Sequence, residues 1–237
     1  MALRERLLAA APSRREWELI GALGAALVLL AILVVAGTLT RFDQFALDHL
    51  MPWLRPSAVS HNSSAGYWRP FPLGISTGAK LVDTLTYPCS LLISAIVVGA
   101  AALVFWRNGR HLTALGLGTA WAVGNAIEWA GKHTLTRSAL YGTTDGVRIH
   151  VGSYDDSFPS GHMIRGIIVS YAAVLLLEGR WSWAIAVWAA LVGPALVLQS
   201  AHTPTDVFGG ALIGLILLVF MRAAARSELA PQRQRKL

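Results

Sequence analysis

The chain has 237 residues, of which 54% are hydrophobic and only 14% are charged. Soluble domains usually carry about 25% charged residues, so this composition excludes an ordinary soluble protein and indicates that lipid is the main solvent. The formal net charge is +7. Basic residues gather at the ends of apolar runs and at the termini, which favours a membrane-topology signal over binding to nucleic acid.

Six apolar runs follow one another along the chain, and each approaches the length of about 20 residues that a helix needs to cross a bilayer. They are residues 19–39, 87–106, 112–130, 163–177, 183–198 and 207–221. The last three are slightly short, and their flanks are expected to complete them. We therefore predict an all-α, polytopic membrane bundle of about six helices in a single domain, residues 1–237, whose first helix is retained and not cleaved as a signal peptide.

The segment between the first two runs, residues 40–86, is rich in proline and aromatic residues. Residues 42–54 are expected to form a short amphipathic helix on the membrane surface, and residues 57–66 a loop. The only cysteine, Cys89, has no disulfide partner in the chain and is expected to be a small packed residue. Tryptophans suit the membrane interface. Those near the predicted span ends are Trp17, Trp53, Trp68, Trp106, Trp129, Trp181 and Trp183.

Basic residues predict the orientation of the bundle. They lie in the N-terminal segment, after the second run at Arg107 and Arg110, after the fourth at Arg180, and in the C-terminal tail. With six spans these four segments share one face, which the positive-inside rule assigns to the cytoplasm. The extracytoplasmic face then carries residues 40–86, 131–162 and 199–206. We therefore expect a multi-pass protein of the cell membrane with both termini in the cytoplasm.

Three polar segments fall on the extracytoplasmic face at the ends of predicted helices, namely residues 131–137, 158–162 and 202–206. Ionisable residues near hydrocarbon are costly, so their gathering here is a functional signal. Asp206 follows His202 by four residues. At that spacing the carboxylate can hold one ring nitrogen and raise the basicity of the other, as a nucleophile requires.

The same segments offer groups that handle phosphate. His162 can protonate a leaving oxygen. Ser160 and Gly161 precede a predicted helix, whose free backbone N–H groups suit an anion. Lys132 adds the positive charge that phosphoryl transfer needs, although a lysine here is also typical of a side chain that reaches along apolar surface to the membrane interface.

These segments resemble the type 2 phosphatidic acid phosphatase family, membrane lipid phosphatases related to vanadium haloperoxidases. The signature of that family is Lys-x6-Arg-Pro, then Pro-Ser-Gly-His, then Ser-Arg-x5-His-x3-Asp. Residues 159–162 match the second motif in full, His202 and Asp206 match the last pair, and Lys132 matches the first lysine. The resemblance covers about residues 80–222 and implies six helices with an extracytoplasmic site.

The resemblance also implies a role for each matching residue. His202 would form a phosphohistidine, Asp206 would orient it, and His162 would be the general acid. The residues that would bind phosphate are Lys132, Ser160 and Gly161.

Both signature arginines are absent from this chain. Ala139 and Leu140 stand where the family has Arg-Pro, and Ala195 and Leu196 stand where it has Ser-Arg. Such arginines would hold phosphate oxygens with a bidentate fork. Three nearby arginines are candidates to replace them: Arg137 first, Arg165 second, and Arg148 in the connecting loop.

Two acidic residues are accessory candidates. Glu128 lies four residues before Lys132, so it can pair with the lysine on one helix face or touch the substrate. Asn125, one turn earlier, belongs to the same polar stripe. Asp156 can bind a cation, shape the loop or be a solvated acid. No cluster of metal ligands is present in the sequence, so neither a metal nor a cofactor is expected.

Three functions fit these residues. The first is a phosphatase that acts on a polyprenyl or glycerolipid (di)phosphate through a phosphohistidine. The second is a transferase on the same scaffold, which would pass a head group, phosphoryl or glycosyl group to an acceptor and would fit the missing arginines. The third is a non-catalytic lipid-phosphate binder. The expected partners are a membrane lipid and the bilayer, and the sequence leaves the lipid and the oligomeric state open.

Overall fold

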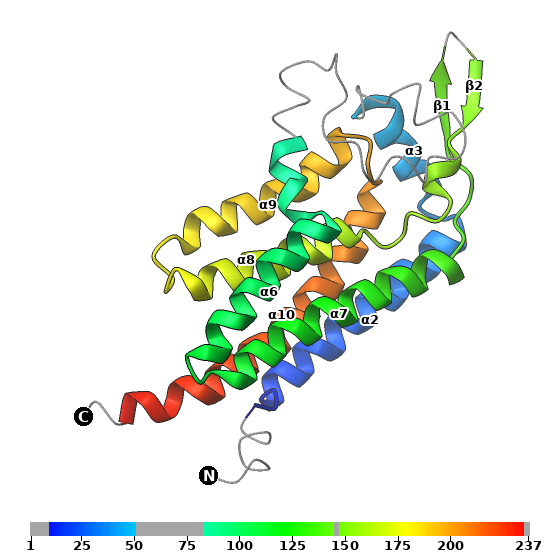
Figure 1. Ribbon diagram of the computed structural model, residues 1–237. Helices are drawn as coiled ribbons and strands as arrows, with labels where there is room; N and C mark the ends of the chain where they lie inside the picture. The colour runs from blue at the N-terminus through cyan, green and yellow to red at the C-terminus, as the bar shows by residue number, and fades with distance from the viewer. Residues whose placement is uncertain (1–9, 51–82, 145–146, 235–237) are drawn as a thin grey trace.

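The computed structural model describes residues 10–50, 83–144 and 147–234, and their backbone is mostly helical (Figure 1). Six long helices correspond in order to the six predicted runs. They are α2 (Arg14–Val35), α6 (Leu91–Arg107), α7 (His111–Thr134), α8 (Gly161–Leu176), α9 (Ser182–Leu198) and α10 (Pro204–Gln234). The prediction of an all-α bundle of about six helices is therefore confirmed.

Shorter elements lie at one end of the bundle. Helix α3 (Thr40–His49) follows α2, and the 3-10 turn η2 (Tyr87–Cys89) precedes α6. An antiparallel hairpin of β1 (Tyr141–Thr144) and β2 (Val147–His150) pairs Tyr141 with His150, and the turn η3 (Gly152–Tyr154) follows it. Sequence analysis did not predict the hairpin.

The observed helix ends differ from the predicted ones for local reasons. Helix α2 begins at Arg14, ahead of the predicted residue 19, because Ser13 and Glu16 form a capping box. The second run is divided, and its two parts, Asp83–Cys89 and Leu91–Arg107, meet at an angle of 55°. Helix α10 continues beyond residue 221 as far as Gln234.

Only some of these helices are long and apolar enough on their own to cross a bilayer. They are α2 and the Pro204–Glu228 part of α10, with the bent pair around η2 as a third if it counts as one span. Helices α8 and α9 are apolar but have 16 and 17 residues. Short or broken helices at a site are tolerated where protein buries their ends, and α8 is the most enclosed helix of the bundle.

Helix α8 occupies the centre of the bundle and packs against α6, α7, α9 and α10. Its inward residues join one core with residues of those neighbours, including Leu117, Ile168 and Met221. Helix α2 packs on α10 and is mostly exposed, with apolar side chains such as Leu29 and Ile32 on its surface. These outward apolar faces suit lipid contact.

Other expectations have mixed outcomes. Cys89 is fully buried beside Val192 and Leu196, as expected for a packed residue. The expected surface helix 42–54 is present as α3 but ends at His49, and residues 51–54 and the expected loop 57–66 lie outside the described residues. Trp53 and Trp68 also lie outside them. The remaining interface tryptophans are exposed at helix ends, and they are Trp17, Trp106, Trp129, Trp181 and Trp183.

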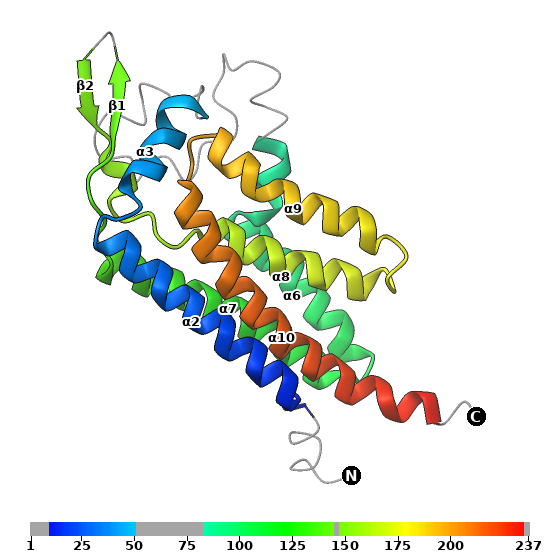
Figure 2. The ribbon, with the colours of Figure 1, turned by 180° about the vertical axis from the view of Figure 1, so that it is seen from behind.

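The two ends of the bundle differ in what they carry. The start of α2 and the end of α10 lie at one end, near the connection between α6 and α7, whereas α3 and the hairpin lie at the other (Figures 1 and 2). This arrangement agrees with the predicted grouping of connections into two faces. Which face meets the cytoplasm stays a prediction.

Candidate functional site

The three motif segments meet where α7 ends and where α8 and α10 begin. Close packing at glycines makes this meeting possible. A Cβ atom on Gly131 of α7 would lie 2.5 Å from the ring of Pro159, and one on Gly210 of α10 would lie 2.4 Å from the carbonyl oxygen of Ser160. The segment that leads into α8 is therefore held tightly between α7 and α10.

Two histidines face each other at this meeting point. The ring centroids of His162 and His202 are 5.8 Å apart. His202 is 6% exposed, and its Nδ1 lies 3.7 Å from Asp206 Oδ2 and has no hydrogen-bond partner among the described residues. That distance is longer than a hydrogen bond, and such contacts are often long before substrate binds. The carboxylate is thus on the correct side of the ring to orient it.

Asp206 is fully buried and its position is fixed by the start of α10. Its Oδ2 accepts hydrogen bonds from Ser157 Oγ at 2.7 Å and from the Thr203 N–H at 3.0 Å. The Asp206 N–H donates back to Thr203 Oγ1 at 3.4 Å. Thr203 and Asp206 therefore form a capping box, with Pro204 at the first helical position, where proline is favoured.

Arg137 fixes the position of this carboxylate. Its Nη1 donates to Asp206 Oδ1 at 3.0 Å and to Thr203 Oγ1 at 2.8 Å, and its Nη2 donates to Asp43 of α3. Asp43 is fully buried and also accepts from Thr205 Oγ1 at 2.6 Å. Burial raises the pKa of Asp43, and the Arg137 guanidinium opposes that shift. These contacts dock α3 onto the start of α10.

Tyr154 of the turn η3 links two loops beside this network. Tyr154 is buried, and its hydroxyl donates to the carbonyl oxygen of Ser200 at 2.8 Å. Burial raises the pKa of the Tyr154 phenol, so it stays protonated as a donor. The loop before α8 is thereby tied to the loop before α10.

A second ion-pair network lies on the α7 side. Glu128 accepts from Lys132 Nζ at 2.7 Å and from Arg165 Nη1 at 2.5 Å, so the anticipated pairing of Glu128 with Lys132 is present. Arg165 Nη1 also donates to Asn125 Oδ1 at 2.8 Å. Through Glu128, whose carboxylate lies against Gly161, Lys132 and Arg165 are placed beside the start of α8, where His162 lies.

Ser160 and Gly161 have packed surroundings in this structure. Ser160 is fully buried and caps α8, since its Oγ accepts from the Met163 N–H at 3.3 Å. Its own N–H donates to the Asp206 carbonyl oxygen at 2.9 Å. The Glu128 carboxylate lies directly against Gly161, because a Cβ there would be 1.8 Å from Oε2.

The PAP2 superfamily model matches residues 113–228, which include all three motif segments. This part of the chain is therefore similar to the PAP2 superfamily. The crystal structure of a transmembrane PAP2 type phosphatidylglycerolphosphate phosphatase from Bacillus subtilis is similar, with a TM-score of 0.56 and 18% identity over 86% of this chain and 94% of that chain. The likeness shows a shared fold, and the resemblance drawn from the motifs is confirmed. Among curated proteins, none matches the chain.

The two positions where the signature has arginines, Ala139 and Leu196, have apolar residues. Leu196 is fully buried in α9 against Cys89 and Val192, whereas Ala139 is half-buried before the hairpin. The buried place of Leu196 offers no water to a guanidinium. The arginines that do lie at the site come from elsewhere, as Arg137 and Arg165.

Two predicted accessory residues lie apart from the histidine pair. Arg148 is exposed on the hairpin, with its guanidinium carbon 5.4 Å from the ring centroid of Tyr141. Asp156 is exposed in the loop before α8. In the described part of the chain, no group of three or more His, Cys, Asp or Glu side chains is arranged to hold a metal ion.

Several residues of the network were missed by sequence analysis: Asp43, Ser157, Thr203 and Thr205. The capping role of Thr203 could have been predicted from the sequence, because Thr-Pro-x-Asp is typical of a capped helix start. No sequence pattern predicts the role of Asp43, since it lies 94 positions before Arg137 on a separate helix.

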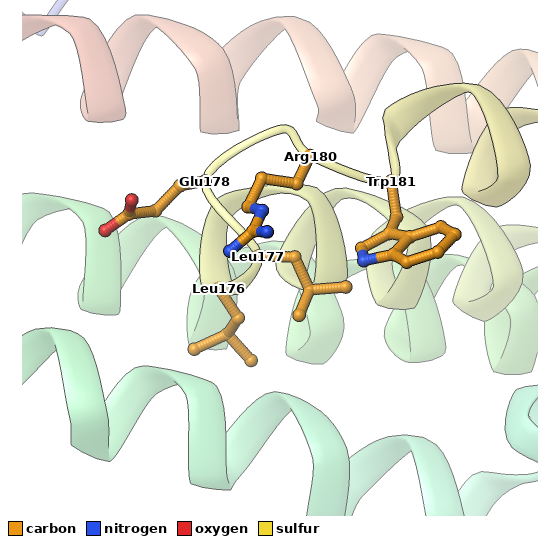
Figure 3. A pocket seen from close by; sticks show the side chains of 5 residues that line it. All are labelled: Leu176, Leu177, Glu178, Arg180 and Trp181. Carbon is orange, nitrogen blue, oxygen red and sulfur yellow. The ribbon is translucent and has the colours of Figure 1, made fainter.

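The hollow beside the turn between α8 and α9 lies away from the histidine pair. It has a volume of about 220 Å³ and is lined by Leu176, Leu177, Glu178, Arg180 and Trp181 (Figure 3). His162 lies at the opposite end of α8. The hollow therefore plays no part in the chemistry of the histidine pair.

Proposed function

We propose that the chain is a membrane lipid-phosphate phosphatase. It removes phosphate from a polyprenyl or glycerolipid (di)phosphate through a phosphohistidine on His202, at the extracytoplasmic face. The observation that carries the proposal is the His162–His202 pair, with ring centroids 5.8 Å apart and Asp206 beside Nδ1 of His202. A nucleophile, an orienting acid and a second histidine thus come together from two helix starts.

The geometry supports the following sequence of steps. Nε2 of His202 attacks phosphorus, because Nδ1 faces Asp206. The bond from phosphorus to the lipid oxygen breaks, and His162 donates a proton to that oxygen. Water then attacks the phosphohistidine, gives a proton to His162 and releases inorganic phosphate, which restores both histidines. Lys132 and Arg165, which bind Glu128 beside Gly161, provide positive charge at the start of α8.

The test is phosphate release from a panel of lipid phosphates by the purified protein, beside His202→Ala. Removal of a nucleophile that acts with partners as a unit costs at least about a thousandfold in rate. We expect that loss, together with an acid-labile phosphoenzyme that forms in the wild type and not in the variant. Arg148→Gln, an exposed change away from the site, is the control and keeps full activity. Release that persists in His202→Ala contradicts the proposal.

A transferase on the same scaffold is the second candidate. The observation that favours it is the replacement of both signature arginines, with Leu196 fully buried in the place of one. A site with fewer phosphate ligands would hand the head group, phosphoryl or glycosyl group to an alcohol or sugar acceptor. Product that gains the group only when an acceptor is added, without free phosphate, favours this candidate. Binding of lipid phosphate without either reaction indicates a binder.

A further inference from the structure

Glu128 occupies the place at the start of α8 where the sequence pattern expects phosphate. Its carboxylate lies against Gly161, and its two oxygens accept hydrogen bonds from Lys132 at 2.7 Å and Arg165 at 2.5 Å. A carboxylate and a phosphate share negative charge and strong acceptor oxygens, so both suit the same cations. Lys132 and Arg165 are therefore already partly neutralised.

The charges around the histidine pair balance within the described residues. Glu128 opposes Lys132 and Arg165, and the pair of Asp43 and Asp206 opposes Arg137. Three cations thus face three carboxylates. A doubly charged phosphate would enter without a matching excess of positive charge.

The low solvent exposure of these side chains makes the balance of charge important for phosphate binding. The side chain of Glu128 is 12% exposed, that of Lys132 is 19% and that of Arg165 is 4%. Partly buried charges are poorly screened by salt and water. A second negative charge placed close to Glu128 is therefore unfavourable, whereas a single one is met by Lys132 and Arg165.

We propose that Glu128 is a specificity-determining residue that makes the site prefer a phosphate group with one negative charge over one with two. The preferred group is a phosphodiester or a singly protonated phosphomonoester. This inference rests on the proposed function, in that a lipid phosphate must bind beside His162 and His202. It adds that the carboxylate at Gly161 sets which charge state binds.

The experiment measures binding, so it does not depend on turnover. Two ligands share one alkyl chain: an alkylphosphonic acid and its monomethyl ester. Above the second pKa of the acid, the acid carries two negative charges and the ester carries one. Dissociation constants are measured in detergent for the wild type, for Glu128→Gln, and for Glu178→Gln, the same chemical change at an exposed residue of the turn between α8 and α9.

We expect the wild type to bind the ester more tightly than the acid by about tenfold. Glu128→Gln keeps the shape of the side chain and removes its charge, so the preference for the ester should fall by about tenfold. Glu178→Gln should leave the preference unchanged. A preference that Glu128→Gln does not alter overturns the inference and leaves the proposed function intact. A wild type that binds neither ligand overturns the proposed function itself.

A measurement on the wild type covers the case in which Glu128→Gln does not fold, since Arg165 would lose a buried partner. Binding of the acid is followed as the pH is raised through its second pKa, with the ester as the reference for protein titration. The ratio of acid affinity to ester affinity should fall as the second charge appears. A ratio that rises contradicts the inference.

Discussion

Arg137 illustrates how one buried side chain can decide the geometry of its neighbours. Its guanidinium joins Asp43 of α3 to Asp206 of α10, and both carboxylates are fully buried. Only its Nε lacks a hydrogen-bond partner among the described residues. The planar fork of arginine suits two acids at once, which an ammonium group does not match.

Loss of this brace should cost stability. In Arg137→Gln two buried carboxylates lose their cation, and breaking such a pair lowers the free energy of unfolding by about 3–5 kcal/mol. Thermal unfolding in detergent measures the change, with Arg148→Gln on the exposed hairpin as the matched control, expected within about 0.5 kcal/mol of wild type. If Arg137→Gln were as stable as wild type and only raised KM, Arg137 would act as a phosphate ligand and not as a brace.

Residues of the site differed in how far the sequence could predict them. His162, His202 and Asp206 stand in short motifs whose spacing has a chemical reason, and the structure brings them together. The pairing of Glu128 with Lys132 followed from helical spacing. Asp43 could not be predicted, because its partner is reached only through the tertiary fold, and no periodicity links α3 to α10.

At the scale of elements, the site depends on how closely α10 approaches the start of α8. Gly210 lies where a Cβ would meet the backbone oxygen of Ser160 at 2.4 Å, and backbone cannot rotate away as a side chain can. In Gly210→Ala the two helix starts must separate. Overpacking of this kind costs about 1–3 kcal/mol, and it should also lower kcat, because His202 and Asp206 move with α10.

Thermal unfolding and phosphate release measure these two effects. Gly118→Ala is the matched control, since a Cβ at this exposed position of α7 meets nothing within 4 Å. Alanine favours a helix over glycine by up to about 1 kcal/mol, so the control should be neutral or slightly stabilised. Unchanged stability and rate in Gly210→Ala would show that the contact between α10 and α8 can accommodate a methyl group.

The long helices could be read from the sequence because each is one apolar run bounded by polar residues. Their ends were predicted less well, since capping decides them: Ser13 with Glu16 moved the start of α2, and Thr203 with Asp206 set the start of α10. The hairpin was missed because each strand has four residues, too few for an alternating pattern to stand out.

At the scale of the whole molecule, the site and the cluster of basic connections lie at opposite ends of the bundle. The histidine pair, α3 and the hairpin lie at one end, and the start of α2, the end of α10 and the connection between α6 and α7 lie at the other (Figure 2). Apolar side chains such as Leu29 and Ile96 face outward between the two ends. A bilayer across this middle zone would leave the site on the face with fewer basic connections.

Thiol labelling in intact cells measures that orientation. Ser153→Cys places a thiol on the exposed turn η3 near the site, and Ser182→Cys places one at the exposed start of α9 at the opposite end. The two variants are matched, and the native Cys89 gives little background because it is fully buried. A membrane-impermeant maleimide should label Ser153→Cys in intact cells and Ser182→Cys only after permeabilisation. The reverse pattern would put the site in the cytoplasm, so its lipid phosphate would then be drawn from the inner leaflet.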